Sequence, residues 1–184
     1  MQGEGHHTGR AAAFVRFSGC NMQCAFCDTD HRHYRLMSAD DIVQALQPFP
    51  ARYVVLTGGE PSLQADQALI DLLHRHQYTV AIETNGTKPL PRGIDWVTVS
   101  PKPLPDGRYA PLALSRCNEL KVLFLSPDYR PQTFGVVADY YFLQPCDTGD
   151  AQKNRAITDA AVEYIKQFPS WRLSLQTHKL AEFK

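Results

Sequence analysis

Short runs of apolar residues recur along the chain and are separated by polar or amphipathic segments. Each run is five or six residues long, and most are rich in β-branched or aromatic side chains, as in buried strands. These runs predict seven strands, at residues 12–17, 52–56, 79–83, 95–99, 119–124, 139–143 and 171–176.

Three other segments carry apolar residues at the three- and four-residue spacing of an amphipathic helix. They start near Ser38, Ser62 and Asn154, and Ser38 and Asn154 are of types preferred at helix N-caps. The second is expected to run to about Gln77. The apolar faces are Ile42, Ala45 and Leu46 in the first, Leu69, Ile70, Leu72 and Leu73 in the second, and Ile157, Ala160, Ala161, Tyr164, Ile165 and Phe168 in the third.

Strands mixed with helices in this way indicate an α/β protein with a mostly parallel sheet. Seven strands and three clear helices are too few for a complete eight-unit barrel, so we expect a partial TIM-like barrel. Prolines and Asp106-Gly107 predict an irregular loop over residues 101–111. At 184 residues, the chain is expected to form a single domain over residues 1–184.

A polar motif follows directly after each of the first four predicted strands. The carboxyl ends of parallel strands meet at one edge of a sheet, which is where α/β proteins bind ligands. The catalytic and binding residues should therefore lie together on one face of the molecule. The motifs begin at Cys20, Gly58, Thr84 and Ser100.

The charge balance narrows the classes of partner. Lys and Arg together number 19, as do Asp and Glu, so the chain is not expected to bind nucleic acid or an anionic membrane. Its apolar runs fall far short of the roughly 20 residues of a membrane-spanning helix, and no secretory signal is visible. Five cysteines, three of them crowded together, argue against a disulfide framework and favour a reducing cytoplasm.

The crowded cysteines, Cys20, Cys24 and Cys27, form the pattern CxxxCxxC. Structural zinc sites are closed by four ligands, and ordinary iron–sulfur proteins supply four thiolates. Three thiolates therefore favour a 4Fe-4S cluster in which one iron keeps an open position. A zinc knuckle that uses His31 or His33 is one alternative, and scattered buried thiols are another. Two further cysteines are interpreted as buried thiols without a role in the cluster: Cys117 and Cys146.

The segment from Thr57 to Pro61, Thr-Gly-Gly-Glu-Pro, follows the second strand. Its glycines let the backbone approach a ligand closely, and Glu60 could accept a hydrogen bond from an ammonium group. An ordinary strand-to-helix turn is the alternative. Glu83 could likewise be a solvated acid, and residues 100–102 could form only a turn.

Two features flank the cysteines. Arg16 lies within the first strand, where a guanidinium is costly unless paired, so a substrate carboxylate is one candidate partner and an internal ion pair is the other. Asp28 and Thr29 supply hard oxygen ligands just after Cys27, which suit Mg²⁺ better than a softer metal.

Together these motifs resemble the radical S-adenosylmethionine (SAM) superfamily and, more narrowly, the 7-carboxy-7-deazaguanine synthase family. The broader resemblance rests on the cysteine pattern, with Phe26 before its last cysteine, and on residues 58–61. The narrower one extends over nearly the whole chain, through segments 2–5, 27–29, 83–86, 100–102, 143–145 and 174–179.

The resemblance implies a compact radical SAM core that converts 6-carboxy-5,6,7,8-tetrahydropterin to 7-carboxy-7-deazaguanine in queuosine and 7-deazapurine biosynthesis. A deoxyadenosyl radical derived from SAM would abstract the hydrogen at C6. A Mg²⁺-assisted ring contraction with loss of ammonia would follow, and the hydrogen would be returned to regenerate SAM. An external electron donor such as flavodoxin and a homodimer are also implied.

The same resemblance assigns roles to residues at matching positions. Cys20, Cys24 and Cys27 would hold the cluster, and Thr29 would hold Mg²⁺, with Asp28 as a further candidate. The positions that match SAM contacts are Gly59, Glu60, Glu83, Ser100, Pro101, Lys102, Gln144, Pro145, Cys146 and Asp147. The positions that match substrate contacts are Met1, Gln2, Gly3, Glu4, Arg16, Thr57, His178 and Lys184.

Some expectations have competitors. Gln2 and Glu4 lie at the start of the chain, where fraying would weaken substrate binding, and His178 could simply cap the last strand. A glycyl-radical-enzyme activating enzyme shares the cluster and the Gly-Gly-Glu motif, but it acts on a protein and would not need the Gln2 motif or a metal at Thr29. A non-catalytic metal-binding or electron-carrier module would explain only the cysteines.

Overall fold

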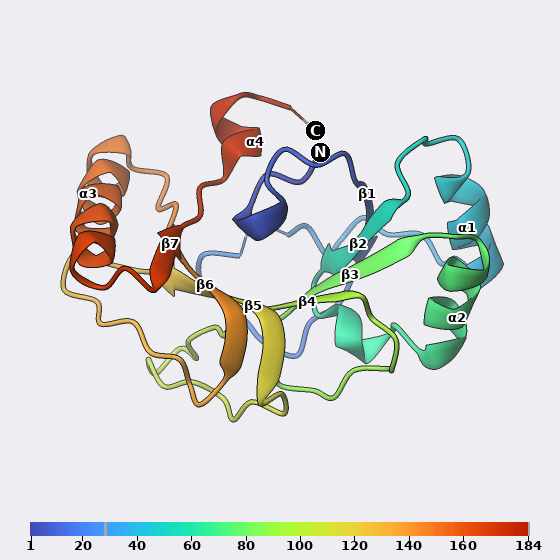
Figure 1. Cartoon of the computed structure of the whole chain (residues 1–184), viewed down its shortest axis with the longest axis horizontal. Coiled ribbons are helices and arrows are strands. Elements are labelled where there is room, and N and C mark those ends of the chain that lie inside the picture. Colours follow the sequence, from blue (N-terminus) through green and yellow to red (C-terminus); the bar gives the residue numbers. More distant parts are fainter. Residues whose placement is uncertain (28, 184) are drawn as a thin grey trace.

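A computed structural model describes residues 1–27 and 29–183, and in them one seven-stranded sheet organises the fold (Figure 1). All neighbouring strands are parallel and follow one another in chain order. The strands are β1 (Ala13–Phe17), β2 (Tyr53–Gly58), β3 (Thr79–Thr84), β4 (Trp96–Val99), β5 (Arg116–Phe124), β6 (Val137–Pro145) and β7 (Trp171–Leu173).

The sheet is open, since in the described residues β1 pairs only with β2 and β7 only with β6. The predicted partial barrel is therefore confirmed, and each predicted strand has a counterpart. Some boundaries differ: β2 continues through Gly58, and β7 ends at Leu173 rather than at Gln176.

Two of the three predicted helices have other bounds than expected because their N-caps lie elsewhere. They are α1 (Ala39–Leu46), α2 (Gln67–Arg75), α3 (Ala151–Gln167) and α4 (Thr177–Leu180), with the 3₁₀ turns η1 (Gly5–His7) and η2 (Pro61–Leu63). Ser38 caps α1 through a capping box with Asp41, as expected for this residue pair. Asp66 caps α2, and Asp150, not Asn154, caps α3. No helix within residues 1–27 and 29–183 is long and apolar enough to cross a membrane.

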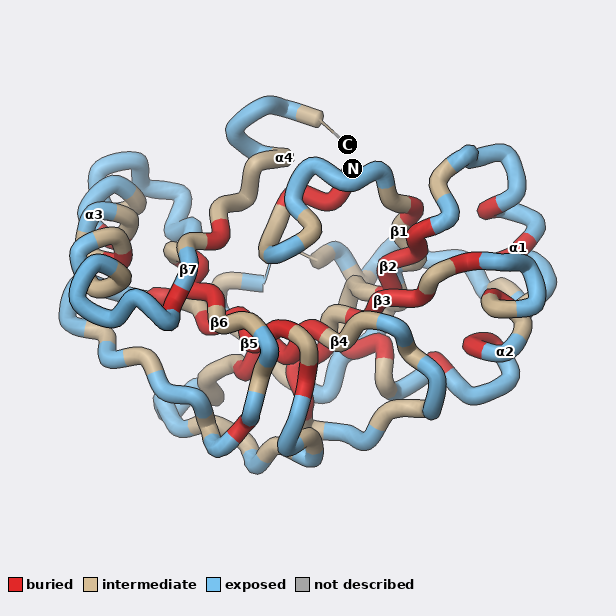
Figure 2. The backbone as a smooth tube through the Cα atoms, viewed as in Figure 1, coloured by how far each residue is buried: buried red, intermediate tan, exposed pale blue. Residues whose placement is uncertain are grey.

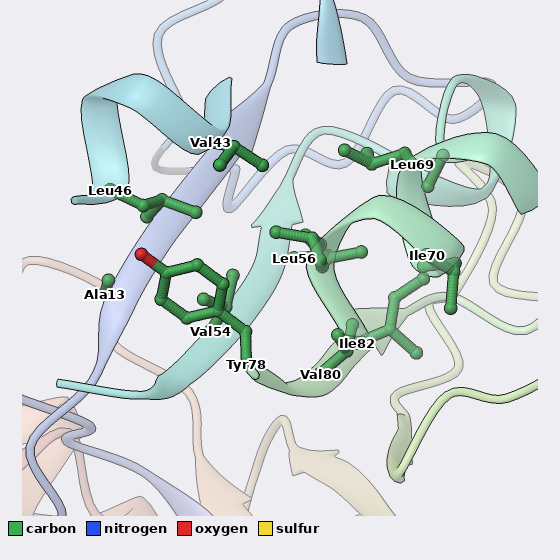
Figure 3. Close-up of a cluster of buried hydrophobic side chains, with 12 residues drawn as sticks. Ala13, Val43, Leu46, Val54, Leu56, Leu69, Ile70, Tyr78, Val80 and Ile82 are labelled. Atoms are coloured by element: carbon green, nitrogen blue, oxygen red, sulfur yellow. The ribbon is translucent and has the colours of Figure 1, made fainter. Parts of the chain in front are cut away.

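One hydrophobic core lies between β1–β3 and the helix pair α1 and α2 (Figure 3). Val54, Leu56 and Ile82 from the strands are fully buried there. On α1 the buried positions are Val43 and Leu46, so the predicted face was wrong at Ala45, which is exposed.

A second core lies on the same side of β4–β7, where α3 packs mainly on β6 and β7. Loops without helices cover the rest, since residues 100–115 and 125–136 connect β4, β5 and β6. Their apolar side chains pack on this core: Leu112, Leu114, Tyr129, Phe134 and Val136. Figure 2 shows the result, with buried positions running along the strands and exposed positions on the outer turns of the helices.

The opposite, inner face of the sheet is covered by residues 1–10, which we call the N-terminal strap (Figure 1). Two backbone hydrogen bonds close the strap into a loop, from Gln2 N to Arg10 O and from Gly9 N to Gln2 O, both 2.8 Å. The ring of His6 stacks on Trp96, with 4.9 Å between centroids. The strap thus fills the hollow that a closed barrel would fill with side chains.

Candidate active site

The cysteine loop follows β1 at the carboxyl-end edge of the sheet. Cys20 and Cys27 are exposed, Cys24 is half-buried, and all three thiols are free. Burial raises the pKa of Cys24, and Lys102 opposes this shift. The thiols therefore lie at the surface and within electrostatic reach of one another and of a cation.

This donor set fits an iron–sulfur cluster better than a single ion. In the described residues, no three His, Cys, Asp or Glu side chains converge on one point, so the zinc alternative has no ligand set there. His31 instead accepts from the Gly19 N–H at 3.2 Å, and His33 pairs with Asp30 at 2.8 Å. A cluster does not need such convergence, because each thiolate binds a different iron.

The glycine motif after β2 packs directly beneath this loop. Gly59 N donates to Phe17 O at 2.8 Å, and Glu60 N donates to Gly19 O at 2.9 Å. A Cβ on Gly59 would stand 2.0 Å from the Gly19 carbonyl oxygen, and Gly58 has a φ of 107°. Only glycines allow the two backbones to approach this closely.

Glu60 joins the glycine motif to the end of β3. Its carboxylate is 1% exposed and accepts from Thr84 Oγ1 at 2.6 Å, Asn85 N at 2.7 Å and Ser62 N at 3.0 Å. Asn85 in turn donates to Asn21 of the cysteine loop at 2.9 Å. Ser100 N also donates to Thr84 O at 2.8 Å. All four predicted motifs are therefore cross-linked, and the Glu60 carboxylate already accepts hydrogen bonds from protein donors.

The strap places two predicted substrate residues against β3 and β5. Gln2 is buried and donates to Glu83 at 2.8 Å, so this end of the strap is held against the sheet and is not frayed. Glu4 accepts from Lys121 and, at 2.9 Å, from Gln176. Lys121 also donates to Glu83 at 3.0 Å. A buried polar network thus joins the strap, two strands and the segment before α4.

Lys121 was missed by sequence reasoning. It lies on β5 with its side chain 5% exposed, and burial acts to lower its pKa, but the neighbouring carboxylates Glu4 and Glu83 raise it instead. The same ammonium overcomes the effect of burial on Glu4 and lowers the pKa of that carboxyl to about 2. A signal exists in the sequence: Glu119 and Lys121 alternate with Leu120 and Val122, which predicts two polar side chains on one face of a strand.

Glu119 lies deeper in the same interior. It is 3% exposed and accepts from His6 N at 2.9 Å. Burial raises the pKa of its carboxyl to about 7, with Lys121 opposing the shift. A cavity of about 10 Å³, near the lower limit for one water, lies between the strap and the sheet. Its polar lining comes from Gln2, Glu4, His7, Tyr53, Glu83, Thr98 and Glu119.

The other SAM-matching residues lie at the ends of β4 and β6. Ser100 is buried and accepts from Lys102, whose pKa burial lowers. Gln144 is buried and accepts from Ser174 Oγ at 2.9 Å. Asp147 is exposed and pairs with Lys179 at 3.0 Å. Pro101 is buried, Pro145 is half-buried, and Cys146 and Cys117 are buried thiols as interpreted.

Arg16 differs from its expected environment. It is exposed because β1 is an edge strand, so the premise of a costly buried guanidinium was wrong. In the described part of the chain it forms no ion pair; its guanidinium lies 5.2 Å from the centre of the Phe14 ring. Its register partner is Thr57. The Thr29 hydroxyl donates to Gly58 O at 3.1 Å, which brings this predicted metal ligand beside the glycine motif.

The chain's last described segment returns to the strap. His178 lies in α4, not at the end of a strand, so its interpretation as a strand cap was wrong. Thr177 N donates to Gly3 O at 2.9 Å. A Cβ on Gly3 would lie 2.3 Å from His178 Nδ1, so the ring packs on the strap backbone. Met1 is exposed, and two candidate residues, Asp28 and Lys184, lie outside the described residues.

Comparison with known proteins relates this chain to one enzyme family. A family model described as the radical SAM superfamily matches residues 14–106. A 7-carboxy-7-deazaguanine synthase from Bacteroides thetaiotaomicron is 48% identical over 184 residues, which are 100% of this chain and 94% of that protein. A protein of the same name from Bordetella pertussis is 47% identical over 97% of this chain and 92% of its own length.

Solved structures agree with these sequence relatives. The crystal structure of QueE from Escherichia coli superposes with a TM-score of 0.75 and 30% identity, covering 95% of this chain and 89% of that one. Streptococcus suis SuiB is 13% identical with a TM-score of 0.53, covering 89% of this chain and 48% of its own, and shares the fold alone.

Proposed function

This chain belongs to the radical SAM superfamily and, within it, to the family of 7-carboxy-7-deazaguanine synthases, and from this premise we propose that it converts 6-carboxy-5,6,7,8-tetrahydropterin to 7-carboxy-7-deazaguanine with loss of ammonia. The observation that carries the proposal is the meeting of the cysteine loop, the glycine motif and the strap around one end of the sheet. A glycyl-radical-activating enzyme would have no use for the strap network.

The cluster would be held by Cys20, Cys24 and Cys27, and when bound with SAM it supplies a 5′-deoxyadenosyl radical. The protein itself would bind and orient SAM and the substrate and shield the radical from water. Gly58 and Gly59 let the backbone pack closely beneath the cysteine loop. The Glu60 carboxylate holds that turn to the end of β3 by accepting a hydrogen bond from Asn85 N. The remaining proposed SAM contacts are Glu83, Ser100, Pro101, Lys102, Gln144, Pro145, Cys146 and Asp147.

The pterin would bind between the strap and the loop. Gln2 and Glu4 offer amide and carboxylate groups that suit the donors and acceptors of a pterin ring edge. Arg16 is exposed and unpaired among the described residues, so its guanidinium remains available for the substrate carboxylate. Thr29 would supply an oxygen to Mg²⁺ near that carboxylate. Met1, Gly3, Thr57 and His178 complete the described part of the proposed substrate site.

The proposal includes an external one-electron donor such as flavodoxin, since Cys20 and Cys27 lie exposed where a small protein could approach. Free thiols in the cluster loop also favour a reducing cytoplasm. We further propose that residues 1–184 act as one domain, supported by the single sheet, and that the enzyme is a homodimer.

The test is anaerobic reconstitution of the cluster, followed by incubation with SAM, dithionite, Mg²⁺ and the carboxypterin. The expected product is 7-carboxy-7-deazaguanine, identified by its mass and ultraviolet spectrum. The matched control is Cys117→Ser, which removes a buried cysteine outside the cluster pattern and should leave the iron content unchanged. Iron-loaded protein that cleaves SAM but never yields the ring-contracted product would overturn the substrate assignment.

A further inference from the structure

Lys121 lies at the centre of a buried charge cluster, and the chemistry proposed above gives this lysine no role. Its ammonium contacts Glu4 from the strap and, at 3.0 Å, Glu83 from β3, while its side chain is 5% exposed. Glu119 lies two residues before it on the same face of β5. Three carboxylates therefore surround one buried cation.

This arrangement depends on the cation. Carboxylates that approach one another in a poorly solvated interior repel, and a buried charge without a partner is strongly destabilising. Glu4 is attached to the sheet by Lys121 and Gln176, and Glu83 is shared by Lys121 and Gln2. Without the ammonium, Glu4 and Glu83 would lose their common partner and move apart.

We propose that Lys121 is a positioning residue for substrate recognition, which holds Glu4 beside Glu83 so that the Glu4 carboxylate accepts the N–H donors of the substrate's pyrimidine edge. This inference rests on the proposed function. A pterin carries a 2-amino group and a ring N–H on one edge, and a fixed carboxylate is suited to bind such donors. Lys121 acts through these groups and not on the reacting carbon.

The titratable and charged groups around this pair are Lys121 and Glu119 from β5, Lys102 from the loop after β4, Tyr53 from β2 and His7 from the strap. Because the Lys121 ammonium keeps the pKa of Glu4 near 2, Glu4 is fully ionised across the working pH range of an enzyme. Removal of the ammonium should raise the pKa of the Glu4 carboxyl. Substrate binding should then weaken at acidic pH, where Glu4 would become protonated.

The test compares Lys121→Met and Lys121→Arg with the wild-type holoenzyme, and Lys166→Met, on the exposed face of α3, serves as the control. Lys121→Met should raise the KM for the carboxypterin at least tenfold. Its kcat/KM should also gain an acid limb between about pH 5 and 7 that the wild type lacks. Lys121→Arg should restore part of the KM. Cleavage of SAM without pterin should change little, because the cysteine loop is untouched.

A double variant separates positioning from general damage. If Lys121 acts through Glu4, then Lys121→Met combined with Glu4→Gln should raise KM little more than the more harmful single change. Additive effects, or an unchanged pH profile in Lys121→Met, would overturn the inference. If the wild-type holoenzyme forms no product, the proposed function has failed instead, so the two failures are distinct.

Discussion

Thr29 brings one hydroxyl oxygen to the region between the cysteine loop and the glycine motif, where it donates to Gly58 O at 3.1 Å. If this oxygen is a Mg²⁺ ligand, Thr29→Ala should require roughly tenfold more Mg²⁺ for half-maximal activity. Thr29→Ser keeps the hydroxyl and should stay close to wild type. The measurement is a Mg²⁺ titration of product formation, and unchanged activation in Thr29→Ala would place the metal elsewhere.

Glu60 gives a second prediction, this time on stability. Its buried carboxylate accepts three hydrogen bonds, and Glu60→Gln would turn an NH₂ group toward a donor. We expect a loss of about 2 kcal/mol in the free energy of unfolding, measured in urea. Glu163→Gln, on the exposed face of α3, is the control and should change stability by less than about 0.5 kcal/mol. Equal losses in both variants would rule out this role for Glu60.

At the level of single residues, the sequence is most informative where chemistry demands a rare pattern. The cysteine spacing and the glycines after β2 identify the ligand-binding edge, because few other structures need them. Arg16 is different: whether it is buried depends on β1 lying at the edge of the sheet, which is a property of strand order. Lys121 was overlooked because a lysine in a strand is usually solvated.

Among the elements, the strap depends on a glycine that admits the buried acid of β5. Gly5 has a φ of 64°, and a Cβ there would lie 2.1 Å from the Glu119 carboxylate. Gly5→Ala should therefore displace the strap and raise the KM for the pterin several-fold, with a smaller effect on SAM cleavage. The readout is steady-state kinetics of both reactions.

Gly9→Ala is the matched control for this change. Gly9 also has a positive φ, of 84°, but among the described residues nothing beyond its two chain neighbours lies within 4 Å of its added Cβ. The two variants therefore share the backbone strain of about 1 kcal/mol and differ in the collision with Glu119. A KM for Gly9→Ala as high as that for Gly5→Ala would assign the effect to strain alone.

The order and type of most elements could be predicted because apolar periodicity records which face of each segment is buried. The N-cap positions were less predictable, because several polar residues lie near the start of each helix. Asp66 caps α2, and Asp150 caps α3 in place of the predicted Asn154. The short helix α4 was missed because four residues carry no periodic signal. Its place is set by Thr177, which donates to the strap.

On the scale of the whole molecule, the buried Glu119 makes stability depend on pH. Its folded-state pKa is about 7, above the ordinary value of 4.5, so between these values the folded chain holds a proton that the unfolded chain has lost. Unfolding then releases a proton and is favoured as pH rises. This group should remove up to about 3 kcal/mol of stability between pH 4.5 and 8.

Glu119→Gln imitates the protonated acid and should flatten that decline, which urea unfolding at pH 5 and pH 8 can measure. Glu4 acts in a separate window, because its lowered pKa of about 2 makes its contribution disappear only as pH falls from 4.5 toward 2. If wild type and Glu119→Gln lose stability equally between pH 5 and 8, another group is responsible.

The strap also affects the order in which the protein can assemble during translation. Residues 2–6 leave the ribosome before their partners, which include Glu83, Glu119, Lys121 and Gln176. Contacts between such distant residues form slowly, because a long loop of chain must be closed before they are gained. The strap must wait, exposed, until the last strand and α4 have been synthesised. Completion of the substrate pocket is then a late event that coincides with completion of the fold.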